Sequence, residues 1–259
     1  MILLLLLLLA VPVSAQISSG GGPVVMGTLE GAPSVSPTFW HKMPNGSGTT
    51  VTAFLGDSGI TSNGTAWVAH GTNNFGLDFD ANDDLANFGT NYDGLSAAPF
   101  SVSAWVAADS YGESSTGRIV GKGSGANTSW TMSISGAASV NRLQMKCATN
   151  TSNAGDLFVS DTGSFDPYIG TALVHVGAWC NCNVMDCSAQ LYINGLPVNT
   201  TLNTDTTTGT QVDDSAYTLN IGSLQNGGNT FEGDIDDVRV IPAQMTDANF
   251  FWIFKGGPQ

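Results

Sequence analysis

The feature that most constrains the fold is a series of short segments in which apolar and polar residues alternate, separated by turn-forming residues. Ten such segments lie between residues 76 and 241, namely GLDF, PFSVSAWVAA, GRIVGK, SWTMSIS, RLQMKCA, GDLFVS, ALVHVGAWC, AQLYING, YTLNIG and DIDDVRVI. Alternation with a period of two indicates half-buried β-strands. The sequence therefore predicts an all-β fold. One domain is expected, because no Pro- or Ser-rich break divides the ten segments.

One helix is expected after the last strand, in the segment TDANFFWIF at 246–254. Thr246 is a residue type that caps helix N-termini. Phe250 and Phe254 are spaced to lie on one face, so they are predicted to pack back onto the sheets.

The N-terminal segment MILLLLLLLAVPVSA is apolar but too short to span a bilayer. It ends in Val13-Ser14-Ala15, so residues 1–15 are predicted to be a secretory signal peptide. An uncleaved hydrophobic anchor is the alternative, because no Lys or Arg precedes the apolar run. Residues 16–37 are rich in Gly, Pro and Ser, which predicts an arm or linker before a domain at 38–256. No further membrane span is expected. A secreted protein, or one on a cell or virion surface, is predicted.

The charge balance is strongly acidic, with 21 Asp and Glu against 7 Lys and Arg and a net charge of −14. Such a chain repels phosphate backbones and attracts cations. Nucleic acid is therefore not expected as a partner.

Four cysteines, Cys147, Cys180, Cys182 and Cys187, are typical of an oxidising compartment. Strand alternation places all four thiols on apolar faces, which favours structural disulfides. A zinc site is the rival interpretation, although the spacing differs from paired C-x₂-C knuckles. Of the three possible pairings, we expect Cys182–Cys187 to close a hairpin and Cys147–Cys180 to join neighbouring strands.

The order of nine motifs carries a family resemblance. They are NGSGTTV, GDSG, GLDFDANDDL, FSVSAWV, IVGKGS, LVHVGAW, LYING, LNIGS and FEGDIDDVRV, followed by the short helix. This order resembles the laminin-G-like domain of the concanavalin A-like lectin/glucanase superfamily. The resemblance implies a two-sheet antiparallel jelly-roll sandwich whose rim loops bind ligands. The chain departs from the family pattern at Leu173, where a Trp is usual, and at Cys180-Asn181, where Tyr-Asp is usual.

The acidic strand near the C-terminus raises the question of a metal. Strict alternation puts Asp236 on the same face as Val238 and Val240, where an unpaired acid is costly. Oxygen ligands suit calcium, and the resemblance implies a structural calcium held through an acid of the final strand. The predicted ligands are Asp236 together with Asp57, Asp80 and Asp84, with Asp83 as a further candidate. A solvated acidic turn is the alternative interpretation of these acids.

No enzymatic activity is expected. Glycosidases pair two carboxylates across the scissile bond. The three glutamates, Glu30, Glu113 and Glu232, are scattered along the chain, and no predicted inner strand alternates acids. The three histidines lack a G-x-S-x-G partner, and His175 is expected to be a packing residue.

The remaining prediction is a non-catalytic recognition module that binds glycans or glycoproteins, with a structural calcium. Sugar sites stack an aromatic ring on the sugar and add amide or carboxylate hydrogen bonds. Trp179 lies on the polar side of its strand and Tyr111 in a loop, so these two are weak candidates, with simple packing as the alternative. Trp130 is expected in the core. The alternative function is a structural or adhesive surface or virion protein that docks to other protein subunits.

Overall fold

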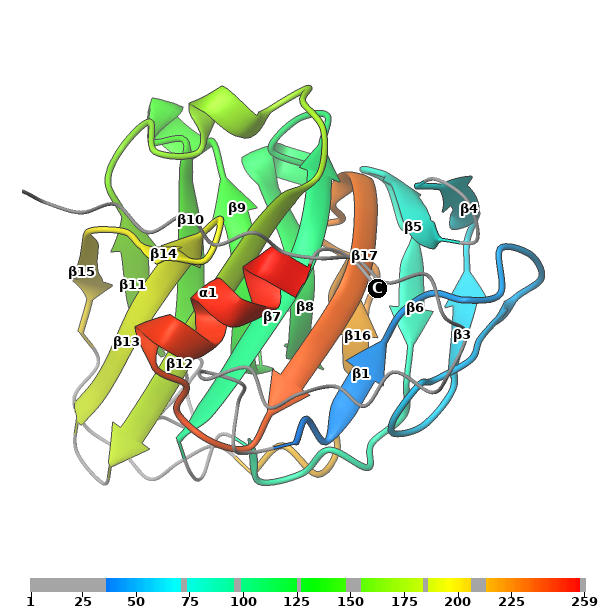
Figure 1. Cartoon of the computed structure of the whole chain (residues 1–259), viewed down its shortest axis with the longest axis horizontal. Coiled ribbons are helices and arrows are strands. Elements are labelled where there is room, and N and C mark those ends of the chain that lie inside the picture. The colour runs from blue at the N-terminus through cyan, green and yellow to red at the C-terminus, as the bar shows by residue number, and fades with distance from the viewer. Residues whose placement is uncertain are drawn as a thin grey trace, which may run out of the picture. The chain divides into compact units, whose positions relative to one another are not determined.

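The computed structural model describes residues 36–70, 74–95, 99–124, 127–147, 155–183, 186–205 and 213–256. The predicted signal peptide, and the predicted arm apart from its last two residues, lie outside the described residues. The described strands belong to one unit, Gly31–Gln259. They form two antiparallel sheets packed face to face, which confirms the predicted all-β sandwich (Figure 1).

The sheet that carries the C-terminal helix is called the front sheet. Its strand order is β14 (Leu196–Pro197), β13 (Asp186–Ile193), β12 (Val174–Asn183), β7 (Phe100–Ala108), β17 (Glu232–Ile241), β5 (Phe75–Asp80) and β4 (Ala66–Ala69), with β1 (Phe39–His41) also paired to β17. Strands β7 and β17 lie at its centre, so segments that are more than 100 residues apart in sequence are neighbours.

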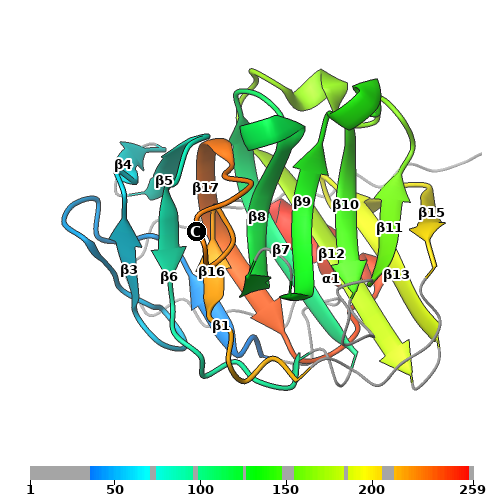
Figure 2. The same cartoon turned by 180° about the vertical axis from the view of Figure 1, so that it is seen from behind.

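The second sheet, called the back sheet, faces the viewer in Figure 2. Its order is β15 (Thr200–Thr204), β11 (Asp156–Ser160), β10 (Arg142–Cys147), β9 (Asn127–Ser135), β8 (Thr116–Ser124), β16 (Leu219–Ile221), β6 (Leu85–Asn87), β3 (Gly59–Ser62) and β2 (Thr50–Val51). Short 3₁₀ turns interrupt the connections at Glu113–Ser115, Ala137–Ser139 and Asp166–Tyr168.

The main core fills the space between the sheets, as the alternating pattern requires. Each central strand points every second side chain inward, for example Val102 and Val106 on β7 and Met132 and Ile134 on β9. Trp130 is fully buried there, as predicted. Burying one such side chain contributes about 1.5–3 kcal/mol relative to leaving it exposed.

A second, smaller core lies on the outer side of the front sheet, under the helix α1 (Asp247–Gly256). Thr246 caps the helix, because its Oγ1 accepts the backbone N–H of Asn249 at 3.3 Å. Phe250 is fully buried and stacks on Tyr192 with ring centroids 3.9 Å apart. Gly177 lies below Phe250, and a Cβ there would meet the Phe250 ring at 2.5 Å. The predicted helix and its packing are therefore confirmed.

Both disulfides join the cysteines that were paired on sequence grounds. Cys147 on β10 bonds Cys180 on β12, so this disulfide links the two sheets and does not join neighbouring strands of one sheet as predicted. Cys182 bonds Cys187 within the β12–β13 hairpin, as predicted. Three of these sulfurs lie within 4.8 Å of one another. As disulfides they are not thiolates, so in this state they do not offer zinc ligands. Two disulfides are consistent with an extracellular location.

The long predicted strands are all present, and the strands that were missed are short. β1, β2, β3, β4, β6, β14 and β15 have two to five residues each. Such segments are too short for alternation to be visible. No helix among the described residues is long and apolar enough to cross a bilayer.

Candidate functional site

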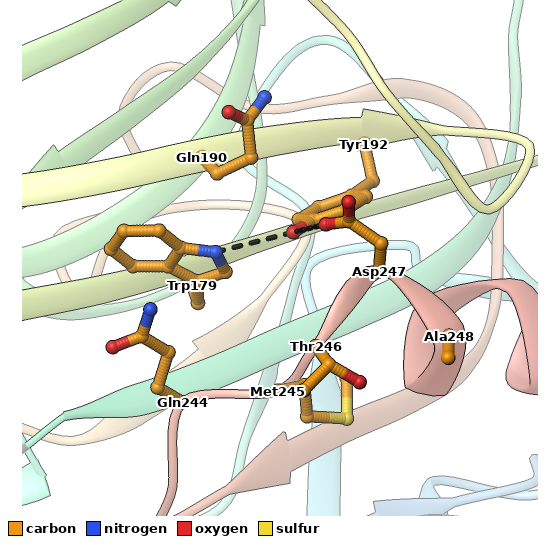
Figure 3. A pocket seen from close by; sticks show the side chains of 8 residues that line it. All are labelled: Trp179, Gln190, Tyr192, Gln244, Met245, Thr246, Asp247 and Ala248. Atoms are coloured by element: carbon orange, nitrogen blue, oxygen red, sulfur yellow. Dashed lines mark hydrogen bonds between the residues drawn. The ribbon is translucent and has the colours of Figure 1, made fainter. Parts of the chain in front are cut away.

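A pocket of about 610 Å³ lies between the outer face of the front sheet and the start of α1 (Figure 3). Strands β12 and β13 provide its floor, and the segment that enters the helix provides its other wall. The lining residues are Trp179, Gln190, Tyr192, Gln244, Met245, Thr246, Asp247 and Ala248. Trp179 is one of the two residues that the sequence singled out as ligand-binding candidates.

Strand alternation explains why Trp179 faces the pocket. Its neighbours Ala178 and Cys180 point into the main core, so Trp179 points outward. The register of the hairpin places Gln190 directly across from Trp179. An aromatic ring and an amide are thus side by side on the floor, as in Figure 3.

A short chain of hydrogen bonds holds this floor to the helix. Trp179 Nε1 donates to the Tyr192 hydroxyl at 3.2 Å, and that hydroxyl donates to Asp247 Oδ1 at 2.7 Å. Burial, together with the bond to Asp247, raises the pKa of Tyr192, so it stays protonated and donating at neutral pH. Gln190 Nε2 donates to the Val198 carbonyl at 2.5 Å, which fixes the amide.

The lining combines an aromatic face with hydrogen-bonding groups. A half-buried indole offers an apolar face, while Gln190, Gln244 and Asp247 offer hydrogen-bonding groups around it. Asp247 is the one carboxylate among the eight lining residues. Stacking and hydrogen bonding are available here, whereas a carboxylate pair for acid–base work is not.

Tyr111, the other ligand-binding candidate, is not among the residues that line the pocket. Its ring packs on Gly136, where a Cβ would meet it at 2.6 Å, and its hydroxyl donates to Asp166 Oδ1 at 2.8 Å. Burial raises the pKa of Tyr111 further above its ordinary value. Tyr111 thus connects the segment that follows β7 to the segment that follows β11.

The four predicted calcium ligands do not converge on one point, and Asp236 is the clearest correction. A β-bulge interrupts β17 between Asp236 and Arg239, with Asp237 at φ 46°. The extra residue turns Asp236 to the side of Trp105, away from the core face that Val238 occupies. The alternation argument for Asp236 assumed an unbroken strand and was wrong on this point.

Asp236 is buried, but it already has partners. Asn74 Nδ2 donates to Asp236 Oδ2 at 3.0 Å, and His70 Nδ1 lies 3.5 Å from the same oxygen. His70 Nε2 also lies 3.1 Å from Asp234 Oδ2. The hydrogen bond that His70 donates to Asp234, and then its interaction with Asp236, raise the pKa of His70 from 6.5 to about 9. A protonated imidazole at neutral pH therefore places a positive charge beside Asp234 and Asp236.

The other acids of β17 are partnered as well. Asp237 forms a bidentate ion pair with Arg239, whose Nη2 is 2.6 Å from Oδ2, and it also accepts the Trp40 indole N–H. Glu232 accepts a hydrogen bond from Ser110. The acid-rich strand thus binds the early segments of the chain through His70, Asn74 and Trp40.

The remaining predicted metal ligands separate into two places. Asp57 is exposed and accepts a hydrogen bond from Asn91. Asp80 and Asp84 flank the turn between β5 and β6, where Asp84 Oδ2 accepts the backbone N–H of Asp80 at 3.1 Å. Asp84 is buried, and within the described residues its Oδ1 has no hydrogen-bond partner. Burial raises the pKa of Asp84 to about 6.

The other two histidines are buried and neutral at pH 7. His175 packs against both Trp105 and Phe254, and burial lowers its pKa to about 3. Burial lowers the pKa of His41 to about 4, and its Nε2 contacts the Asp57 carbonyl at 3.0 Å. His175 is therefore a packing residue in this structure.

Sequence reasoning missed Gln190, Gln244 and Asp247. Alternation with Tyr192 on β13 could have placed Gln190 on the outer face. No sequence signal places the Gln244–Asp247 segment beside that face, because its position depends on how α1 docks.

Several solved structures share this fold at low sequence identity. The receptor-binding domain of botulinum neurotoxin type G aligns with a TM-score of 0.56 and 12% identity, over 85% of this chain and 51% of that one. A Trypanosoma rangeli sialidase in complex with sialic acid gives 0.58 and 16%, over 83% and 32%. The binding domain of botulinum neurotoxin DC in complex with SialylT gives 0.56 and 16%, over 85% and 51%.

The chain thus spans about half the length of the toxin-domain structures and about a third of the sialidase structure. No curated protein matches the sequence significantly. A family model described as the concanavalin A-like lectin/glucanases superfamily matches residues 80–249, from the end of β5 into α1. The chain belongs to the laminin-G family of this superfamily.

Proposed function

We propose that this protein is a non-catalytic recognition module that binds a sugar residue of a glycan in the pocket between β12, β13 and α1. The observation that carries the proposal is the half-buried ring of Trp179 with Gln190, Gln244 and Asp247 around it. The sugar stacks one face on the indole, and the Gln190 and Gln244 amide oxygens and the Asp247 carboxylate accept hydrogen bonds from its hydroxyls, while the Gln244 amide nitrogen donates to them.

Hydrogen bonds within the protein already hold several of the pocket's side chains in place. The bonds from Trp179 to Tyr192 and from Tyr192 to Asp247 hold the ring, and the Val198 carbonyl holds the Gln190 amide. Groups that are already ordered lose little conformational entropy on binding. The presence of a single carboxylate in the lining supports binding without hydrolysis.

The fold relatives support a carbohydrate ligand without identifying it. Their printed descriptions include a receptor-binding domain, a complex with SialylT and a sialidase with sialic acid. These ligands belong to those proteins, at 12–16% identity. For this chain the ligand is a glycan or glycoprotein on a surface. The protein acts outside the cell, either secreted or held on a cell or virion surface, which agrees with its two disulfides.

Calcium is proposed as a structural cofactor at the β5–β6 turn, with Asp80 and Asp84 as its side-chain ligands. The observation that fits is the buried Asp84 Oδ1, which lacks a partner among the described residues. Calcium binds carboxylate oxygens and would offset the cost of burying this one. Asp57 and Asp236 do not fit the same ion, because they lie elsewhere with partners of their own.

The test is a glycan array probed with the full chain, followed by calorimetry on the sugars that bind. Trp179→Ala removes the stacking face and is expected to lower affinity about tenfold or more. Gln244→Ala changes an exposed side chain of the wall and is expected to weaken binding without affecting folding. Phe251→Ala removes an exposed aromatic of α1 outside the lining and serves as the matched control.

Equal binding by the parent chain, Trp179→Ala and Gln244→Ala would exclude the pocket as the site. If the parent chain bound no glycan on the array, the result would instead favour the alternative function, a structural or adhesive protein that docks to other protein subunits. One observation supports that alternative: Phe54, Leu55 and Ile60 are large apolar side chains exposed near the sheet edge. The molar mass of the protein in solution, measured for the parent chain and for Phe54→Ser, would then test whether it assembles with other subunits through this surface.

A further inference from the structure

The back sheet carries a group of positive charges on the face that points away from the core. Its members are Arg118 on β8 and Arg142 and Lys146 on β10, called here the cationic face. Arg142 and Lys146 alternate with Leu143 and Met145, which point inward, and Arg118 is paired with Ser133, which lies between the inward-pointing Met132 and Ile134. These three are among only seven Lys and Arg residues in a chain of net charge −14. Strands β8, β9 and β10 contain no Asp or Glu.

Within the described part of the chain, Arg118 is held by hydroxyl groups and not by an acid. Its Nη1 donates to Thr131 Oγ1 at 2.9 Å and to Ser133 Oγ at 3.3 Å. Among the described residues it makes no ion pair, and its buried Nε has no hydrogen-bond partner. Burial lowers the pKa of Arg118 to about 10. A guanidinium in this setting is costly unless an anion meets it.

The neighbouring cations strengthen the positive field. Burial and the charge of Arg118 lower the pKa of Lys146, so these two cations repel each other. Arg142 Nη2 lies 3.5 Å from Asn203 Oδ1, and within the described part of the chain the buried Nε of Arg142 has no partner. Because like charges gathered at one place raise the local potential, an anion bound there would lower the energy of Arg118 and Arg142.

The contacts and burial of the guanidinium determine which of its donors can meet a ligand. Thr131 and Ser133 occupy Nη1, and Nε is buried, which leaves Nη2 as the donor for a ligand. Nη2 can donate to an oxygen of a carboxylate or sulfate group. Arg118 and Arg142 are half-buried, so both reach the surface. Figure 2 shows β8, β9 and β10 toward the viewer, with no described helix or strand lying across them.

We propose that the cationic face is a second binding site, for a sugar that carries a carboxylate or sulfate group. Arg118 pairs with the anion, and Arg142 and Lys146 attract it. Nucleic acid is the wrong polyanion for this face, because a chain of net charge −14 repels a ligand with a charge on every nucleotide. That the anionic group belongs to a sugar rests on the proposed function. The anion site itself is argued from Arg118, Arg142 and Lys146 and does not depend on that function.

The experiment compares 3′-sialyllactose, 3′-sulfolactose and lactose by calorimetry on the full chain at low and high salt. Arg118→Gln is expected to reduce affinity for the charged sugars about tenfold, since it removes a charged hydrogen-bond donor. Arg142→Gln provides a second variant closer to the surface. Lys255→Gln removes one exposed positive charge from α1 and is the matched control for net charge.

Three results would support the site: tighter binding of either charged sugar than of lactose, loss of that preference in Arg118→Gln, and weaker binding at high salt. A preference for one charged sugar only would identify the anion as carboxylate or sulfate. Equal affinity for all three sugars would overturn the proposal, as would an equal loss in Lys255→Gln. Trp179→Ala separates the two sites, because it removes sugar binding at the pocket and leaves the preference for charged sugars intact.

Discussion

The outer faces of the two sheets are built differently, although both lie on the same sandwich. The front sheet is covered by α1 and forms a second apolar core around Tyr192 and Phe250, with a row of partnered acids beside it. The outer face of the back sheet carries Ser and Thr side chains and the three residues of the cationic face. One outer face is packed under α1, whereas the other carries Arg118, which has no ion pair among the described residues. We therefore expect substitutions on the two faces to affect stability and ligand binding differently.

The largest expected effect comes from removing the apolar contact on the front sheet. Phe250→Ala leaves a cavity over Gly177 and Tyr192, and it is expected to cost about 3–5 kcal/mol in free energy of unfolding. Ser133→Ala on the back sheet is the control and is expected to cost about 1 kcal/mol, although Ser133 is also buried. Urea unfolding measures both. Similar losses in free energy of unfolding for the two variants would mean that the two outer faces do not differ in how much they stabilise the fold.

The next effect concerns the acids of the front sheet and their dependence on pH. The folded pKa of His70 is raised from 6.5 to about 9, so its stabilisation is present below pH 6.5 and is lost as pH rises toward 9. We expect the parent chain to lose on the order of 2 kcal/mol across this window. His70→Gln keeps a donor but no charge, and it should flatten the change.

Thermal melting between pH 6 and 9.5 provides the measurement. His41 and His175 do not contribute in this window, because burial lowers their pKa values to about 4 and about 3. A parent chain whose melting temperature is constant from pH 6.5 to 9 would mean that His70 is not the cationic partner of Asp234 and Asp236.

The effect of calcium on stability tests the proposed site at the β5–β6 turn, and this effect is expected to be smaller than that of His70. A weak site at the β5–β6 turn is expected to add about 1 kcal/mol at millimolar calcium, which raises the melting temperature by about 2–4 °C. Asp84→Asn removes the charge of the carboxylate whose Oδ1 lacks a partner among the described residues, and it should abolish the response. Asp57→Asn is the control, because Asp57 lies outside this turn. A response that survives Asp84→Asn would place the ion elsewhere.

The comparison also shows what the sequence could predict. Strand alternation and motif order gave the sandwich, the outward direction of Trp179 and the helix capped by Thr246, because these depend on neighbouring residues. The same alternation could have grouped Arg118, Arg142 and Lys146 on one face. What sequence reasoning missed depends on contacts between distant segments. The docking of the 244–248 segment against β12 and β13 is one case.

The β17 bulge is the second case, and it explains why the face on which Asp236 lies was predicted wrongly. A single extra residue at Asp236–Asp237 reverses which side chains face the core, and no feature of DIDDVRV marks it. His70 and Asn74, which approach Asp236 from more than 160 residues away in sequence, could not be named without the fold.

The smallest expected effect on stability is the most informative about the back sheet. Arg118→Met keeps the length of the side chain and removes a buried charge that lacks an acidic partner among the described residues and that repels Lys146. Replacing such a group with an apolar one is often neutral or stabilising, so we expect a change between zero and a gain of about 1 kcal/mol in unfolding experiments. A loss of more than about 1 kcal/mol would show that Arg118 stabilises the fold through Thr131 and Ser133. A neutral or stabilising result, together with lost binding of charged sugars, would show that Arg118 serves ligand binding and does not stabilise the fold. The residues under α1 would then differ, because their packing stabilises the fold.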